Sequence, residues 1–257
     1  MYRKILLVLA LTIGLVLAMG DKPAEAGGAV AVPRGAEPLE SLSADRLYSR
    51  AYAEYGAALD MVYSVQNRKA IEALSLFLEK YPDDPRGLEA QYFLLVVYGR
   101  NNQPQEQVQI ADAYFAGEPT DNALTDSVKL ESLSAYIWTQ NLITANTLYG
   151  EILEKYPTNN SVQAVAHQQY LPALRSAGDL DGQKKIFNFF RADNNRQYLK
   201  NPNNYYIYTY ELAVVYFNEG DFQAARPLFE EVAAQKNNRV LENFADSAES
   251  YVKNLSK

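Results

Sequence analysis

The side chains most often used in catalysis and metal binding are few in this sequence. It contains one histidine, His167, and no cysteine. His167 lies in a stretch of helical pattern without a G-x-S-x-G motif, so we expect a structural histidine rather than part of a Ser-His-Asp set. Without cysteine, the chain forms no disulfide, zinc–thiolate site or thiol nucleophile.

The acidic residues do not form a typical site either. Asp179-Leu180-Asp181-Gly182 resembles the start of a calcium-binding loop, but the twelfth position holds Phe190 instead of glutamate. We interpret Gly178-Asp179 as a turn between two helices. The pairs Asp83-Asp84 and Glu230-Glu231 are adjacent in sequence, and adjacent residues on a helix do not face each other as an acid/base pair must. With no phosphate-binding glycine-rich loop, the sequence predicts a protein that is not an enzyme and has no cofactor or metal.

Tyrosine is the unusual residue. The chain has 20 tyrosines, 10 phenylalanines and one tryptophan. Aromatic and arginine side chains are common anchors in binding interfaces, so tyrosines that helix packing does not require are candidates for binding. Which tyrosines these are depends on the elements that position them.

The first 26 residues have the pattern of a secretory signal peptide. Arg3 and Lys4 precede 16 uncharged residues from Ile5 to Gly20, and Ala24-Glu25-Ala26 fits a cleavage site. An apolar run of this length is shorter than the ~20 residues of a membrane-spanning helix. We predict cleavage after Ala26 and a periplasmic protein without a membrane span; an uncleaved anchor is the alternative. The absence of cysteine excludes a lipoprotein, and residues 27–43, with three glycines and two prolines, are expected to form a flexible leader.

The charge pattern argues against a nucleic-acid partner. The chain has 24 basic and 31 acidic residues, and no run of Lys and Arg is longer than two. A protein that binds nucleic acid needs a basic face to neutralise phosphates.

After Ser43 the sequence shows helical spacing and an internal repeat. The stretch LEKYP occurs at Leu78–Pro82 and again at Leu153–Pro157. The clearest unit is Tyr210 to Asn238, where two helical patterns flank Gly220-Asp221. Glycine supplies a left-handed helix end and aspartate caps the next helix.

This unit resembles the tetratricopeptide repeat. Leu212, Ala213 and Tyr216 supply the large, small and aromatic positions of a first helix, and a small–large–small set follows on the second helix, at Ala225, Phe229 and Val232. The aromatic position recurs at intervals of 37, 38, 38 and 42 residues, at Met61, Tyr98, Tyr136, Leu174 and Tyr216. LEKYP then ends the second helix of repeats one and three. The close-contact position holds Ala70, Ala145 and Ala225, whereas Gln107 and Gln183 fit it less well.

The resemblance covers residues 44–237. It implies an all-α fold, a right-handed α-solenoid of about five helix pairs, with residues 238–257 as a C-terminal capping helix. In this family the first helices line a concave groove. By register, the candidates that face this groove are Tyr52, Tyr55, Tyr63, Tyr92, Arg100, Trp138, Gln168, Arg175, Tyr210 and Asn218. The Lys/Asn clamp of chaperone-binding members is absent, and Pro172 predicts a kinked or split helix in repeat four.

The export signal and the LEKYP ends resemble envelope repeat proteins of the β-barrel assembly and Tol–Pal systems, although a lipid-attachment cysteine and a preceding coiled coil are missing. We therefore expect an exported scaffold or adaptor in envelope assembly or secretion. Its partners would be other envelope proteins or extended peptides. The alternative is a glycan-binding repeat protein associated with cell-wall or exopolysaccharide handling.

Overall fold

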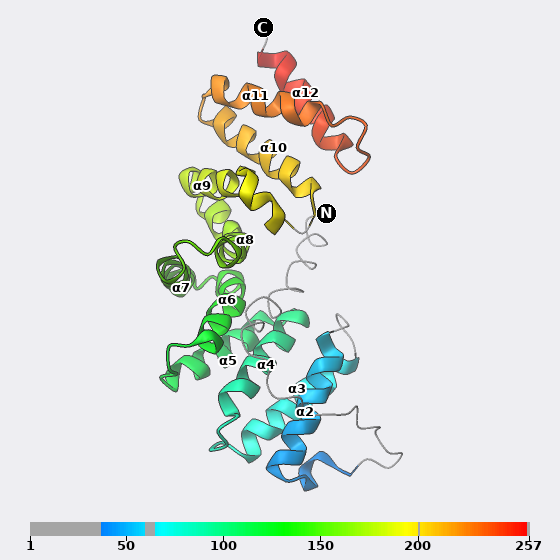
Figure 1. The fold of residues 1–257 in the computed structure, drawn as a ribbon, viewed down its shortest axis with the longest axis vertical. Coiled ribbons are helices and arrows are strands. Elements are labelled where there is room, and N and C mark those ends of the chain that lie inside the picture. The colour runs from blue at the N-terminus through cyan, green and yellow to red at the C-terminus, as the bar shows by residue number, and fades with distance from the viewer. Residues whose placement is uncertain (1–36, 60–64, 200, 256–257) are drawn as a thin grey trace. The chain divides into compact units, whose positions relative to one another are not determined.

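The computed structural model describes residues 37–59, 65–199 and 201–255. This part of the chain consists of helices joined by short turns and contains no strand (Figure 1). The helices are η3 (Leu39–Ser41), α2 (Ala44–Leu59), α3 (Val65–Lys80), α4 (Gly87–Arg100), α5 (Pro104–Ala116), α6 (Ala123–Trp138), α7 (Leu142–Lys155), α8 (Asn160–Ala177), α9 (Leu180–Arg191), η4 (Asp193–Tyr198), α10 (Asn203–Asn218), α11 (Phe222–Ala233) and α12 (Glu242–Leu255).

Consecutive helices pack as pairs: α2 with α3, α4 with α5, α8 with α9, and α10 with α11. The all-α architecture of helix pairs that the sequence predicts is therefore confirmed. The right-handed twist of the array and its membership of the tetratricopeptide family stay predictions. The signal region 1–26, most of the leader, Met61 and Tyr63 lie outside the described residues.

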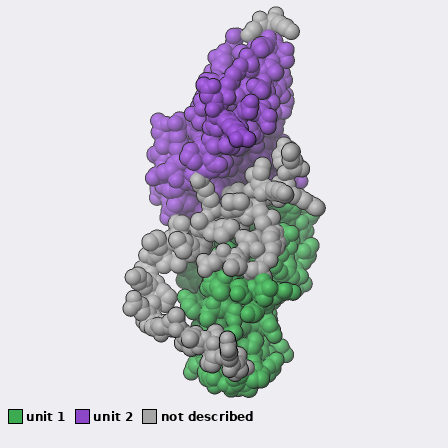
Figure 2. Space-filling view, turned by 90° about the vertical axis from the view of Figure 1, so that its right-hand side faces the viewer, with its two compact units in different colours: residues 1–152 green, residues 153–257 purple. Residues whose placement is uncertain are grey.

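The chain divides into two compact units, Met1–Ile152 and Leu153–Lys257 (Figure 2). The division falls inside α7, although the sequence period continues across it. In unit 1 the first helices of successive pairs are in contact, α2 with α4 and α4 with α6. In unit 2, α9 packs on α10 and α11 packs on α12. In the described residues, no helix is long and apolar enough to cross a membrane.

Glycine–aspartate turns join the helices of two pairs, as the sequence predicts. Gly178 and Gly220 have positive φ angles of 67° and 82°. Asp179 accepts a hydrogen bond from the Gly182 amide at 2.8 Å, and Asp221 caps α11 in the same way. The segment that resembled a calcium loop is thus a turn followed by a helix cap.

The repeated LEKYP stretch marks two helix ends. Lys80 is the last residue of α3 and Lys155 the last of α7, which confirms the predicted position of the motif. In both copies the lysine ammonium lies over the ring of the next residue, 5.2 Å above Tyr81 and 5.7 Å above Tyr156. In the first copy, Lys80 donates to the Leu42 carbonyl at 2.9 Å and the Tyr81 hydroxyl donates to the same carbonyl at 2.6 Å. The motif therefore fastens the segment before α2 to the end of α3.

The close-contact positions hold the residues that the register predicts. Ala70, Ala145 and Ala225 are completely buried. Gln107 is buried too and fits better than expected, because the facing residue on α4 is Gly99, where a Cβ atom would lie 2.6 Å from Gln107 Nε2. This amide donates to the Glu131 carbonyl at 3.1 Å, so its burial leaves the polar group satisfied.

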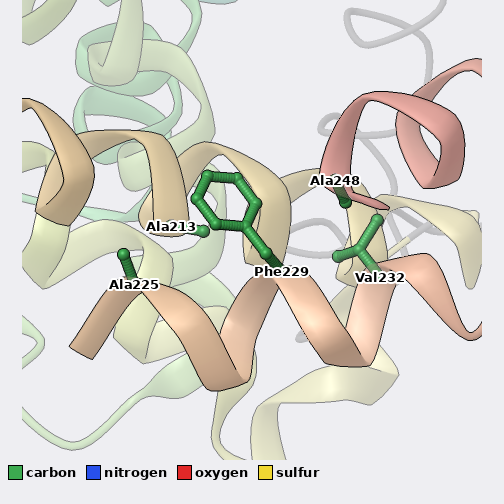
Figure 3. Close-up of a cluster of buried hydrophobic side chains, with 5 residues drawn as sticks. All are labelled: Ala213, Ala225, Phe229, Val232 and Ala248. Carbon is green, nitrogen blue, oxygen red and sulfur yellow. The ribbon is translucent and has the colours of Figure 1, made fainter. Parts of the chain in front are cut away.

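Helix α12 covers the end of unit 2. Its Ala248 joins Ala213 of α10 and three α11 residues, Ala225, Phe229 and Val232, in a buried cluster (Figure 3). The ring of Tyr251 lies parallel to that of Phe229 at 4.4 Å. Polar residues of α12 such as Glu242, Asp246 and Ser250 are exposed, which is the polar outer face that a capping helix requires.

Helix α8 is continuous through Pro172, from Asn160 to Ala177. The expected alternative of two short helices is therefore not what forms. Proline removes a single backbone hydrogen bond and strains one turn, and the surrounding buried residues Leu171, Ala173 and Leu174 keep the helix packed on both sides of it.

Candidate functional site

Aromatic side chains of α2 and α4 gather on one face of unit 1. We call Tyr48, Tyr52, Tyr55, Tyr92 and Phe93 the aromatic face. The three α2 tyrosines follow at i, i+4 and i+7 and therefore share one side of the helix. The ring centroids of Tyr48 and Tyr52 are 6.5 Å apart and nearly parallel, with 15° between the planes. Phe93 of α4 lies 5.5 Å from Tyr52 and 4.3 Å from Tyr55.

The members of the aromatic face differ in exposure. Tyr52 is 49% exposed, whereas Tyr55 and Phe93 are 8% and 7% exposed. Tyr92 is buried as well. The buried rings hold Tyr52 in place, and Tyr52 is the ring that a partner can reach. Of the sequence-based candidates, the structure gathers Tyr52, Tyr55 and Tyr92 here and leaves only the first accessible.

Three tyrosines of this face, Tyr48, Tyr55 and Tyr92, have hydroxyl groups with raised pKa values. Burial raises the pKa of Tyr48, and its hydrogen bond to the Glu89 carboxylate raises it further. Burial also raises the pKa of Tyr55 and of Tyr92, and the negative charge of Glu131 acts in the same direction on both. All three hydroxyls therefore stay neutral near pH 7, and that of Tyr48 donates a hydrogen bond to Glu89.

Arg86 lies at one end of the aromatic face. Its guanidinium carbon is 4.7 Å from the ring centroid of Tyr48 and 5.7 Å from that of Phe77. Two of its nitrogens donate to the Asp84 carboxylate at 2.8 and 2.7 Å, and it also pairs with Asp45 at 3.0 Å. These hydrogen bonds lower the pKa of Asp84 to about 2.

The remaining candidates of unit 1 lie elsewhere. Arg100 is buried and donates through Nε to the Ala58 carbonyl at 3.2 Å and through Nη2 to the Leu59 carbonyl. It caps the last carbonyls of α2, so the structure differs from the prediction that it faces a groove. Trp138, the last residue of α6, is 57% exposed.

The candidates of unit 2 mostly serve packing. Tyr210, predicted to face the groove, instead packs against Phe229, Phe244 and Tyr251 beneath α12, with ring centroids 5.4 to 6.4 Å apart. Its neighbours come from α11 and α12, and the register did not indicate that their aromatic side chains would enclose the ring. The four rings form a packed cluster rather than a binding surface.

Two of the three polar candidates of unit 2, Arg175 and Gln168, have structural contacts. Arg175 of α8 is paired with Glu211 of α10. The Gln168 amide donates to the Tyr198 carbonyl at 3.5 Å. Asn218 is exposed at the end of α10. The candidates of this unit therefore do not gather into one site.

His167 has the structural role that the sequence predicts. It is buried, and the edges of Phe189 and Phe190 meet its ring at centroid distances of 4.6 and 6.4 Å. Burial lowers its pKa to about 4, so the ring is neutral near pH 7. Across the described ranges, no group of three or more His, Cys, Asp or Glu residues is placed to hold a metal ion.

Sequence reasoning missed Tyr48, Glu89 and Phe93 as members of this region. The spacing of Tyr48, Tyr52 and Tyr55 was the available signal, because it places three tyrosines on one side of a helix. Glu89 and Phe93 carried no such signal, since their role depends on the contact between α2 and α4.

No family model and no curated protein matches the chain. The candidate site therefore rests on the geometry of the aromatic face.

Proposed function

We propose that this chain is a protein-binding scaffold of the tetratricopeptide type, exported to the bacterial envelope, that holds extended segments of other envelope proteins against the aromatic face. The role is binding without catalysis or a cofactor. The signal-like residues 1–26 support the location, and the pairing of the helices supports the family.

The observation that carries the proposal is that the ring of Tyr52 is half exposed and packs against buried aromatic rings. Aromatic anchors contribute most to binding when their rotamers are already fixed, because little side-chain entropy is then lost. The contacts of Tyr52 with Tyr48, Tyr55 and Phe93 provide this restraint.

A random-peptide display library, selected on the immobilised full chain, tests the proposal. We expect enriched peptides whose binding is lost with Tyr52→Ala and kept with Phe222→Ala. Phe222 is the matched control, because it is also 49% exposed but lies on α11 in unit 2.

Two outcomes would overturn the proposal. If the selected peptides bind Tyr52→Ala with the same affinity as the parent, the aromatic face is not the binding site. A rise in melting temperature with cell-wall fragments, abolished by Trp138→Ala and accompanied by no peptide binding, would establish the glycan-binding alternative.

A further inference from the structure

The contact between α2 and α4 in unit 1 contains two successive side-chain pairs. Tyr48 donates its hydroxyl hydrogen to Glu89, and one turn further along both helices Tyr52 lies against Phe93. Both steps are i to i+4, and such residues are ~5–6 Å apart at their Cβ atoms. Glu89 therefore lies about one helical turn from Phe93, whose ring contacts Tyr52.

Within the described residues, the Glu89 carboxylate has no basic partner. Its hydrogen-bonded neighbour is the uncharged hydroxyl of Tyr48, and in the part of the chain that the structure describes it forms no ion pair. The nearest arginine in the sequence, Arg86 directly before α4, is paired with Asp84 and Asp45. Arg50, on the same helix as Tyr52, is paired with Glu54 at 2.6 Å.

We propose that Tyr52 and Glu89 form a subsite for an arginine or lysine side chain of the bound segment. This inference rests on the proposed function and specifies the chemistry of the partner. The cation lies over the exposed ring of Tyr52, and its N–H groups donate to the Glu89 carboxylate.

Three observations favour a cation over an anion or an apolar side chain. An aromatic ring attracts a cation through the negative potential of its face. The protein already places a guanidinium in this way on the adjacent ring, since Arg86 lies over Tyr48. The chain as a whole carries a net charge of −7, which attracts basic partners.

Fluorescence anisotropy with a defined probe tests the subsite. The probe is a fluorescein-labelled peptide of four Gly-Arg-Ser repeats, and its matched control has glutamine in place of every arginine. The proteins are the full chain and its variants Tyr52→Ala, Tyr52→Phe, Glu89→Gln and Phe222→Ala. Glutamine at position 89 removes the charge but keeps an acceptor for the Tyr48 hydroxyl.

We expect the parent to prefer the arginine peptide, and Tyr52→Ala and Glu89→Gln each to reduce that preference by about threefold to tenfold. Tyr52→Phe, which keeps the ring, and Phe222→Ala should retain it. Equal binding of both peptides, with loss in Tyr52→Ala, would overturn the cation subsite and leave the proposed function intact. If the parent binds the arginine peptide and neither Tyr52→Ala nor Glu89→Gln changes its affinity, the subsite is also overturned. Binding of neither peptide, together with no Tyr52-dependent peptide from the display library, would overturn both.

Discussion

Tyr52 and Tyr55 are three residues apart on α2, yet one ring is half exposed and the other is buried. The difference comes from α4, because Phe93 packs more closely on Tyr55 than on Tyr52. A single accessible ring on a fixed base is what makes Tyr52 a candidate anchor. Whether a tyrosine can bind a partner depends on the exposure of its ring, and the residue type alone does not reveal that exposure.

His167 makes the stability of the folded protein depend on pH. Burial lowers its pKa from 6.5 to about 4, so the unfolded chain takes up a proton before the folded protein does. The contribution to stability is complete above pH 6.5 and is lost as the pH falls toward 4. The loss is at most about 3 kcal/mol, at 1.36 kcal/mol for each pKa unit.

The variant His167→Gln should therefore lose less stability than the parent between pH 6.5 and pH 5. Chemical denaturation at several pH values measures the free energy of unfolding of both proteins. Near pH 6.5 the change in stability reports the titration of histidine, because carboxylates titrate at lower pH. Parallel curves for the two proteins would contradict the buried, neutral state of His167.

At the scale of elements, the helix pairs depend on small residues where two axes approach. Ala225 of α11 is completely buried and belongs to the cluster that also contains Ala213 of α10 (Figure 3). At Gln107 a longer side chain is accommodated because the facing residue on α4 is Gly99. Around Ala225 the space is already filled by the buried cluster, against which Phe217 of α10 also packs.

Ala225→Trp should consequently destabilise unit 2. Overpacking typically costs about 1–3 kcal/mol, and an indole is far larger than the space available. Thermal unfolding monitored by circular dichroism should show a midpoint lower by several degrees. The control is Gln223→Trp on the same helix, where the side chain is exposed. Equal midpoints for both variants would show that Ala225 is not a close-contact position.

At the scale of the whole molecule, the division at Ile152 and Leu153 was not expected. The repeat period crosses this point without a change. In an array of repeats, each helix pair contacts mainly its neighbours, so sequence periodicity does not reveal where such contacts become fewer. The candidate binding residues are consequently divided between two units, and the aromatic face belongs to unit 1 alone.

The proposed export also concerns the whole chain. If residues 1–26 act as a cleaved signal, mass spectrometry of the protein recovered from the periplasm should show an N-terminus at Gly27. Ala26→Arg should block this processing, because the cleavage site requires a small residue there. Ala31→Arg, beyond the site, is the control and should be processed normally. Recovery of the parent with Met1 in the membrane fraction would support the anchor instead.

The sequence by itself determined the all-α architecture, the pairing of helices, their Gly–Asp turns and the role of LEKYP as a helix end. These features depend on local interactions: helical periodicity, the φ angle that glycine allows, and caps made within a few residues. Ala70, Ala145 and Ala225 could be placed because alanine recurs at the equivalent position of the second helix in repeats one, three and five. His167 could be judged structural because no partner motif accompanied it.

Only the tertiary structure decided which candidates are accessible. Arg100 and Tyr210 had the correct register for a groove, but Arg100 caps α2 from α4 and Tyr210 is enclosed by residues of α11 and α12. Glu89 became part of the candidate site through its contact with Tyr48, 41 residues earlier in the chain. The physical reason is that exposure and pairing are set by neighbouring helices that are distant in sequence, whereas periodicity reports only the face of a residue's own helix.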